Sequence, residues 1–104
     1  MSTKEDELRA SLIESVREGL EIVDGALIDT FHQNLHASGL AEEDIPDELD
    51  LLCSILDKTF GTGSFTVRRA IARQLYSKMG LPFQAYVGKR LSAYVAEVRE
   101  QWKI

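Results

Sequence analysis

Cysteine is almost absent from this sequence, and long apolar runs are absent altogether. A single cysteine among 104 residues cannot form an intrachain disulfide, and sparse cysteine is typical of a reducing compartment, so we expect a cytoplasmic protein. No apolar run approaches the roughly 18 residues that a membrane helix requires, and the opening residues, MSTKEDE, lack the apolar core of a signal peptide. We therefore expect no membrane partner.

Basic residues are scarce in the first half of the chain, and acidic residues are scarce in the second. Residues 1–57 carry 15 acidic and 3 basic side chains, whereas residues 58–104 carry 2 acidic and 9 basic ones, so the net charge of −5 hides a polarised distribution. The apolar fraction of 44% excludes a disordered tail. A chain of this length can bury one modest core, so residues 1–104 are expected to form a single domain.

Alternating apolar and polar residues, the mark of a half-buried strand, are missing, and helical spacing dominates instead. In the first segment, for example, Leu8, Leu12 and Val16 share one helix face. Pro46 is expected to occupy the first position of the third helix and Ser64 to cap the fourth. The predicted helices cover residues 4–22, 25–38, 46–60, 64–79 and 83–102. The predicted fold class is all-α, a compact single-domain bundle of about five amphipathic helices.

Only two histidines are present, and neither they nor the cysteine form a recognisable catalytic motif. His32 and His36, with Asp29 one turn earlier, have a spacing that could offer ligands to zinc, but Gln33 stands where the helical metalloprotease motif needs glutamate. We favour surface histidines at both positions. Cys53 lies on the apolar face of the third helix and is expected to be a buried thiol. We therefore expect no catalytic residue, no metal, no cofactor and no enzymatic activity.

Five basic residues lack a local explanation. Lys58, Lys78 and Lys103 lie at predicted helix C-termini, where the helix dipole favours cations. The five unexplained residues lie elsewhere. Three of them follow the turn Gly61-Thr62-Gly63, which lacks the lysine of a phosphate-binding loop, and two lie in the last predicted helix. Either acidic residues of this chain or an anionic partner must face them. This basic cluster consists of Arg68, Arg69, Arg73, Lys89 and Arg90.

The basic cluster leaves nucleic-acid binding open as an alternative to a protein partner. Residues 75–91 superficially resemble a helix-turn-helix with its turn at Gly80. Bulky Tyr76 stands where such motifs need a small residue, however, and Lys89 stands where they need an apolar one. A protein partner or a second copy of the chain is therefore favoured, and nucleic-acid binding through the basic fourth and fifth helices is the alternative.

The last predicted helix carries the residues best suited to contact a partner. The apolar residues with the spacing of a short coiled-coil seam are Val87, Leu91, Tyr94 and Val98. Core positions within the same chain are the favoured role for most of them. Tyr86 and Trp102 are large aromatic residues of the kind enriched at interface hot spots, so they are the candidate partner contacts.

The order of glycine, proline and apolar pairs between residues 16 and 81 resembles a known family. These features are Gly39-Leu40, Ile45-Pro46, Leu56, Phe60-Gly61-x-Gly63, Ala70-Ile71, Leu75-Tyr76 and Gly80-Leu81. Together they resemble the Nitrosopumilus-type output domains, a family of archaeal all-helical modules that occur alone or attached to sensory proteins. The family brings no catalytic or metal-binding residue onto this chain. The resemblance implies a signalling output domain, and we expect a small non-enzymatic regulatory or protein-interaction module.

Overall fold

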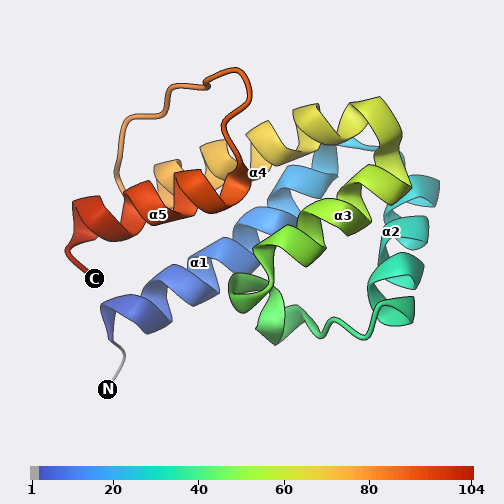
Figure 1. The fold of residues 1–104 in the computed structure, drawn as a ribbon, viewed down its shortest axis with the longest axis horizontal. Helices are drawn as coiled ribbons and strands as arrows, with labels where there is room; N and C mark the ends of the chain where they lie inside the picture. The colour runs from blue at the N-terminus through green and yellow to red at the C-terminus, as the bar shows by residue number, and fades with distance from the viewer. Residues whose placement is uncertain (1–2) are drawn as a thin grey trace.

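The computed structural model describes residues 3–104, which contain five α-helices and three short 3₁₀ helices joined by turns and loops. The α-helices are α1 (Lys4–Gly19), α2 (Gly25–Ala37), α3 (Leu49–Phe60), α4 (Ser64–Lys78) and α5 (Leu91–Trp102). The 3₁₀ helices are η1 (Leu20–Ile22), η2 (Glu42–Asp47) and η3 (Gly61–Gly63). No strand occurs in this range (Figure 1), so the prediction of an all-α bundle is confirmed.

Side-chain caps fix where the first two helices begin. The Thr3 hydroxyl accepts a hydrogen bond from the Asp6 N–H at 3.0 Å, and the Asp6 carboxylate accepts one from the Thr3 N–H at 3.2 Å. This reciprocal capping box satisfies donors that the start of α1 would otherwise leave free. The Asp24 carboxylate accepts from the Ala26 N–H at 3.3 Å and so caps α2. α2 therefore begins at Gly25, as the sequence predicts.

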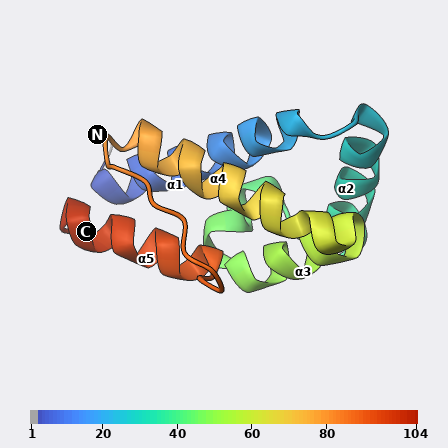
Figure 2. The same ribbon diagram turned by 90° about the horizontal axis from the view of Figure 1, so that it is seen from above.

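The most extensive helix contact of the bundle joins α1 to α4, which the two ribbon views place side by side (Figures 1 and 2). They approach closely at Gly19, because a Cβ atom at this position would lie 2.6 Å from Cγ1 of Ile71. α2 packs on α3, and α5 packs on α3 and α4. The radius of gyration, 13.1 Å, is close to the ~13 Å expected for a folded domain of about 100 residues.

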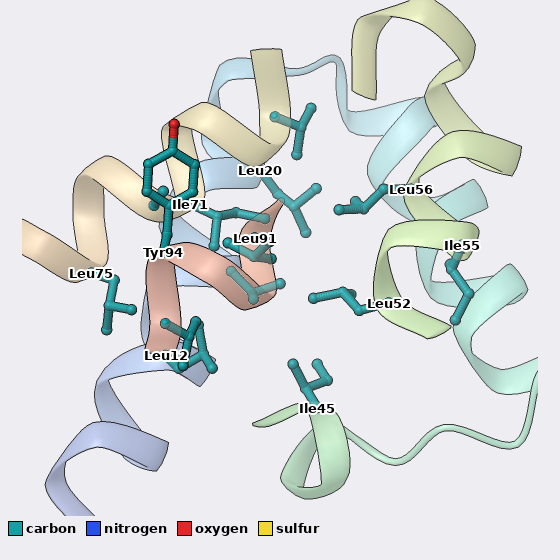
Figure 3. Close-up of a cluster of buried hydrophobic side chains, with 14 of the residues drawn as sticks. Leu12, Leu20, Ile45, Leu52, Ile55, Leu56, Ile71, Leu75, Leu91 and Tyr94 are labelled. Carbon is teal, nitrogen blue, oxygen red and sulfur yellow. The ribbon is translucent and has the colours of Figure 1, made fainter. Parts of the chain in front are cut away.

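Every α-helix contributes to one continuous apolar core. Leu12 of α1, Leu52 of α3 and Ile71 of α4 are fully buried within it. Figure 3 shows these side chains converging with Leu91 from α5. Phe31 joins the core from α2. Because burying one such side chain contributes roughly 1.5–3 kcal/mol, this shared core is the main force that holds the five helices together.

The third helix begins at Leu49, and the prediction that Pro46 starts it is wrong. Pro46 lies inside the 3₁₀ helix η2, where both Ile45 and Pro46 are buried. Burial of this pair holds the segment in a turn of its own, and Glu48, with φ −131° and ψ 48°, departs from helical geometry before α3. A proline in a 3₁₀ turn and a proline at a helix start have nearly the same φ, so the sequence alone does not separate them.

The predicted cap of the fourth helix is also wrong, because Ser64 is the first residue of α4. The cap position is held by Gly63, which makes no side-chain hydrogen bond. Ser64 is fully buried, and its hydroxyl donates to the carboxylate of Asp57 at 2.6 Å. The serine therefore joins α4 to α3 instead of satisfying the free N–H groups of α4.

The last helix begins at Leu91, so the first part of the helix predicted over 83–102 is wrong. Residues 79–90 form an irregular loop, in which Gly88 has φ +78°, a conformation that favours glycine. The loop runs back along the molecule, and α4 and α5 consequently point in the same general direction (Figures 1 and 2). The helix-turn-helix geometry considered for residues 75–91 is therefore not present, because that motif joins its helices by a tight turn.

Candidate functional site

A pocket of about 320 Å³ opens where the loop of residues 79–90 meets the starts of α4 and α5, and we call it the loop pocket. α4 contributes Phe65, Arg68 and Arg69, and α5 contributes Leu91 and Tyr94. The loop contributes Tyr86, Val87, Gly88, Lys89 and Arg90. Every charged side chain of this lining is basic, so the pocket combines apolar walls with positive charge.

Tyr94 anchors the loop to α5. Its hydroxyl accepts a hydrogen bond from the Tyr86 N–H at 2.9 Å, and its carbonyl accepts one from the buried hydroxyl of Tyr76 at 3.1 Å. Lys89 forms an ion pair with Glu97, and its ammonium lies 4.6 Å from the centroid of the Tyr94 ring, within cation–π range. Side-chain contacts, rather than helical backbone bonds, therefore hold this wall of the loop pocket in place.

The charge states around this anchor follow from the same contacts. The hydrogen bond from Lys89 lowers the pKa of Glu97, so the carboxylate is charged at neutral pH. Burial, reinforced by the negative charge of Glu97, raises the pKa of Tyr76. Tyr76 is therefore a neutral hydrogen-bond donor, and Glu97 is an anion that neutralises Lys89.

Arg68 is neutralised in a similar way, whereas two other arginines of the lining are not. Arg68 forms an ion pair with Asp57 and donates to the carbonyl of Cys53 at 3.3 Å. Arg69 and Arg90 are exposed, and within residues 3–104 neither has an acidic side chain at ion-pairing distance. The unneutralised positive charge of the loop pocket is therefore that of Arg69 and Arg90.

The structure brings most of the predicted basic cluster together. The members that line the loop pocket are Arg68, Arg69, Lys89 and Arg90. Arg73 lies outside the lining, with its guanidinium carbon 5.8 Å from the centroid of the Phe83 ring. The cluster thus becomes one site only because the loop carries its last two members back to the start of α4.

Three large apolar side chains are exposed around the pocket. Phe65 is 64% exposed, Tyr86 is 54% exposed, and Val87 is fully exposed. Tyr86 was among the predicted partner contacts, whereas sequence reasoning missed Phe65 and assigned Val87 to a helix. The signal for Phe65 is its place off the apolar helix face that Val67 and Ile71 define. Val87 offers no such signal, because it fits the spacing of the predicted helix.

Trp102, the other predicted partner contact, does not join this surface. It lies at the opposite end of α5 from the loop pocket and is half-buried. Its indole Nε1 donates to the carbonyl of Met79 at 2.9 Å. This bond gives Trp102 a role within the chain, and its contact with a partner stays a prediction.

A second hollow, of about 270 Å³, has an acidic lining to which the first turn of α5 contributes one residue. Its lining is Pro46, Asp47, Glu48, Leu49, Asp50 and Ser92. Ser92 directly follows Leu91, which lines the loop pocket. Arg9 donates to both carboxylate oxygens of Asp47, at 2.6 and 2.7 Å, and these bonds lower the pKa of Asp47. Two hollows of opposite charge therefore share the start of α5.

The histidines and the cysteine lie outside both hollows. His32 and His36 are exposed on α2, and His32 packs edge-on against Phe31 with the ring centroids 5.6 Å apart. In residues 3–104 no three His, Cys, Asp or Glu side chains come together as metal ligands would. Cys53 is half-buried rather than fully buried, and burial raises the pKa of its thiol, which makes it a poorer nucleophile.

Comparisons with known proteins assign no family to this chain. The chain matches no protein-family model, no curated protein and no solved structure. The resemblance to output domains therefore depends on the residues between 16 and 81 alone. Among the helices of residues 3–104, none is long and apolar enough to cross a membrane.

Proposed function

We propose that this chain is a small non-enzymatic regulatory module that binds a protein partner at the loop pocket. The observation that carries the proposal is the exposure of Phe65, Tyr86 and Val87 beside two arginines, Arg69 and Arg90, that have no acidic partner in residues 3–104. Aromatic residues and arginine are the types enriched where proteins bind one another. An apolar patch rimmed by polar residues is typical of an interaction site.

The chemistry of the lining supports binding rather than catalysis. It holds no histidine, cysteine, serine or carboxylate that could act as a nucleophile or a general base, and its two tyrosine hydroxyls, those of Tyr86 and Tyr94, form hydrogen bonds within the chain. Its one lysine, Lys89, is held by Glu97. The resemblance to signalling output domains points in the same direction, because those modules act through interactions.

Selection of peptides from a random display library tests this proposal. We expect peptides to be selected by the native chain and to be lost when Phe65→Ser and Val87→Ser are combined. Ile22→Ser is the matched control, because Ile22 is 58% exposed and lies outside the loop pocket. Selected peptides should shift the NMR signals of the Tyr86 and Arg90 amides. Peptides that bind the double variant as tightly as the native chain would contradict the proposal.

Nucleic-acid binding is the alternative function, favoured by the arginines that lack an acidic partner. Arg69, Arg73 and Arg90 form no ion pair in the described chain, and the exposed Tyr86 offers a ring on which a base of a single strand could stack. Binding of a single-stranded oligonucleotide that weakens steeply with salt would favour this function. The variant Arg73→Gln distinguishes the two functions. Because Arg73 lies outside the loop pocket, its replacement should weaken binding of an oligonucleotide but not binding of a peptide.

A further inference from the structure

We infer that the partner segment is a short acidic peptide with one bulky apolar side chain, which enters the loop pocket while flanking carboxylates bind Arg69 and Arg90. This inference rests on the proposed function and names the chemistry of the partner. Three features of the site lead to it: the distribution of charge, the size of the hollow, and the acidic hollow beside it.

The charge of the loop pocket selects for carboxylates. Arg68 and Lys89 already have carboxylate partners in the chain, but Arg69 and Arg90 do not. One of these free arginines comes from α4 and the other from the loop, so positive charge borders the hollow from two elements. A guanidinium binds a carboxylate through two parallel hydrogen bonds, which makes an acidic side chain a fitting occupant for each position.

The volume of the loop pocket fits a single large side chain of a ligand. Its volume of about 320 Å³ is near the lower end of the roughly 300–1,000 Å³ of small-molecule sites. A small ligand confined to the hollow would leave Phe65 and Val87 exposed, because most of their surface faces solvent. A peptide that continues on both sides of its buried side chain would cover them and form the apolar centre of an interface.

The acidic hollow limits how far an anionic ligand can extend. Ser92, which directly follows Leu91 of the loop pocket, lines it together with three acidic residues. Arg9 neutralises Asp47, so the carboxylates of this lining that have no basic partner within residues 3–104 are Glu48 and Asp50. A long polyanion such as a nucleic-acid strand, or a broad anionic membrane surface, would place negative charge against these carboxylates. A short acidic segment can end before it reaches them.

Fluorescence anisotropy with a labelled peptide, Gly-Glu-Asp-Trp-Glu-Asp-Gly, tests the inference directly. Two further peptides serve as comparisons, one with alanine in place of tryptophan and one with amides in place of the four side-chain carboxylates. We expect the first peptide to bind saturably and each comparison peptide to bind at least about tenfold more weakly, since it lacks either the anchor or the charge.

Matched variants of the protein assign the binding to individual arginines. Arg69→Gln and Arg90→Gln should each weaken binding of the acidic peptide about tenfold, because each removes charge-assisted hydrogen bonds. Lys58→Gln is the control, since Lys58 is exposed but lies outside the loop pocket. Circular dichroism checks that each variant is folded, which we expect because all three side chains are exposed.

The outcomes separate this inference from the proposed function. The acidic peptide and its amide version could bind equally well, with both losing binding when Phe65 and Val87 are changed to serine. That result would overturn the acidic partner but would still support an interaction module. Binding of no peptide at the loop pocket, in this assay and in the display selection, overturns both. Tighter binding of oligothymidylate or of anionic phospholipid vesicles than of the peptide also overturns the inference.

Discussion

Gly19 is the residue whose small size decides how closely α1 and α4 approach. A Cβ atom there would lie 2.6 Å from Cγ1 of Ile71 and 3.0 Å from its backbone nitrogen. Ile71 is fully buried, and its Cα also lies 3.2 Å from the Cβ position, so part of the clash is with the backbone of α4. We expect Gly19→Ala to lower the free energy of unfolding by about 1–3 kcal/mol, because overpacking forces neighbouring groups apart. Urea unfolding followed by circular dichroism measures this change.

Gly25→Ala is the control for this prediction. Within residues 3–104, Gly25 is the only other glycine in an α-helix, and a Cβ atom there would meet nothing within 4 Å. We expect this variant to keep its stability or to gain about 0.4–1 kcal/mol, because alanine restricts the unfolded chain. If Gly19→Ala were as stable as Gly25→Ala, the close approach of the two helices would be wrong.

The Tyr94 hydroxyl joins the loop of residues 79–90 to α5. It is the acceptor for the Tyr86 N–H, at 2.9 Å. We expect Tyr94→Phe to cost about 1 kcal/mol of stability and to speed hydrogen exchange of the Tyr86 amide. Tyr86→Phe is the matched control, because that hydroxyl bonds only the exposed Gln84, at 3.3 Å. Unchanged exchange in Tyr94→Phe would show that the loop is held by other contacts.

The loop of residues 79–90 is a segment whose secondary structure the sequence predicts wrongly. Phe83 and Val87 continue the helical spacing of α5 backward, so periodicity predicts a helix. The structure instead packs Phe83 against Tyr76, with ring centroids 5.2 Å apart, and leaves Val87 exposed. Such packing contacts between side chains override local spacing, and a periodic pattern does not reveal them. The one local signal is Gly88, a helix-weakening residue just before the true start of α5.

Acid should loosen this loop, because Glu97 holds it through Lys89. The ion pair lowers the pKa of Glu97 below its ordinary value of 4.5. A lowered carboxyl pKa means that the stabilisation is present above the ordinary value and is lost as the pH falls through the lowered one. We expect the NMR signals of the Tyr86 and Lys89 amides to shift over that acidic range. Glu97→Gln should show the loosened loop already at neutral pH.

Glu100→Gln is the control for the acid effect. Glu100 is exposed on the same helix, and no ion pair involves it within residues 3–104. Its replacement should leave the pH dependence of the Tyr86 amide unchanged. Identical pH profiles in the native chain and in Glu97→Gln would contradict the role of the ion pair.

Across the whole molecule, folding interleaves charges that the sequence keeps apart. The ion pairs that join the acidic first half to the basic second half are Arg68 with Asp57, Lys78 with Glu14 and Glu18, and Arg99 with Glu5. Composition predicts that a basic cluster exists, but which of its members stay without a partner depends on the packing of α3, α4 and α5. Arg69 and Arg90 could therefore be named as candidates from the sequence and singled out only from the structure.

From the one continuous core we predict that residues 3–104 unfold as a unit. The core includes Phe31 of α2 and Val98 of α5, which belong to opposite parts of the sequence and to the same buried cluster. Trp102, the single tryptophan, reports on the end of α5 through its bond to the Met79 carbonyl. We expect urea transitions followed by tryptophan fluorescence and by far-ultraviolet circular dichroism to coincide, with a slope of about 1–3 kcal/mol per molar urea.

The same two urea transitions, measured for Tyr94→Phe, show whether α5 unfolds separately. Tyr94→Phe weakens the attachment of the loop between α4 and α5, so it would unfold α5 earlier if this helix formed a separate unit. In a single cooperative unit, the same change lowers the midpoints of both transitions equally, because every helix shares the core that Tyr94 helps to form. A fluorescence transition that moves to lower urea while circular dichroism stays behind would show that α5 separates from the other four helices before they unfold.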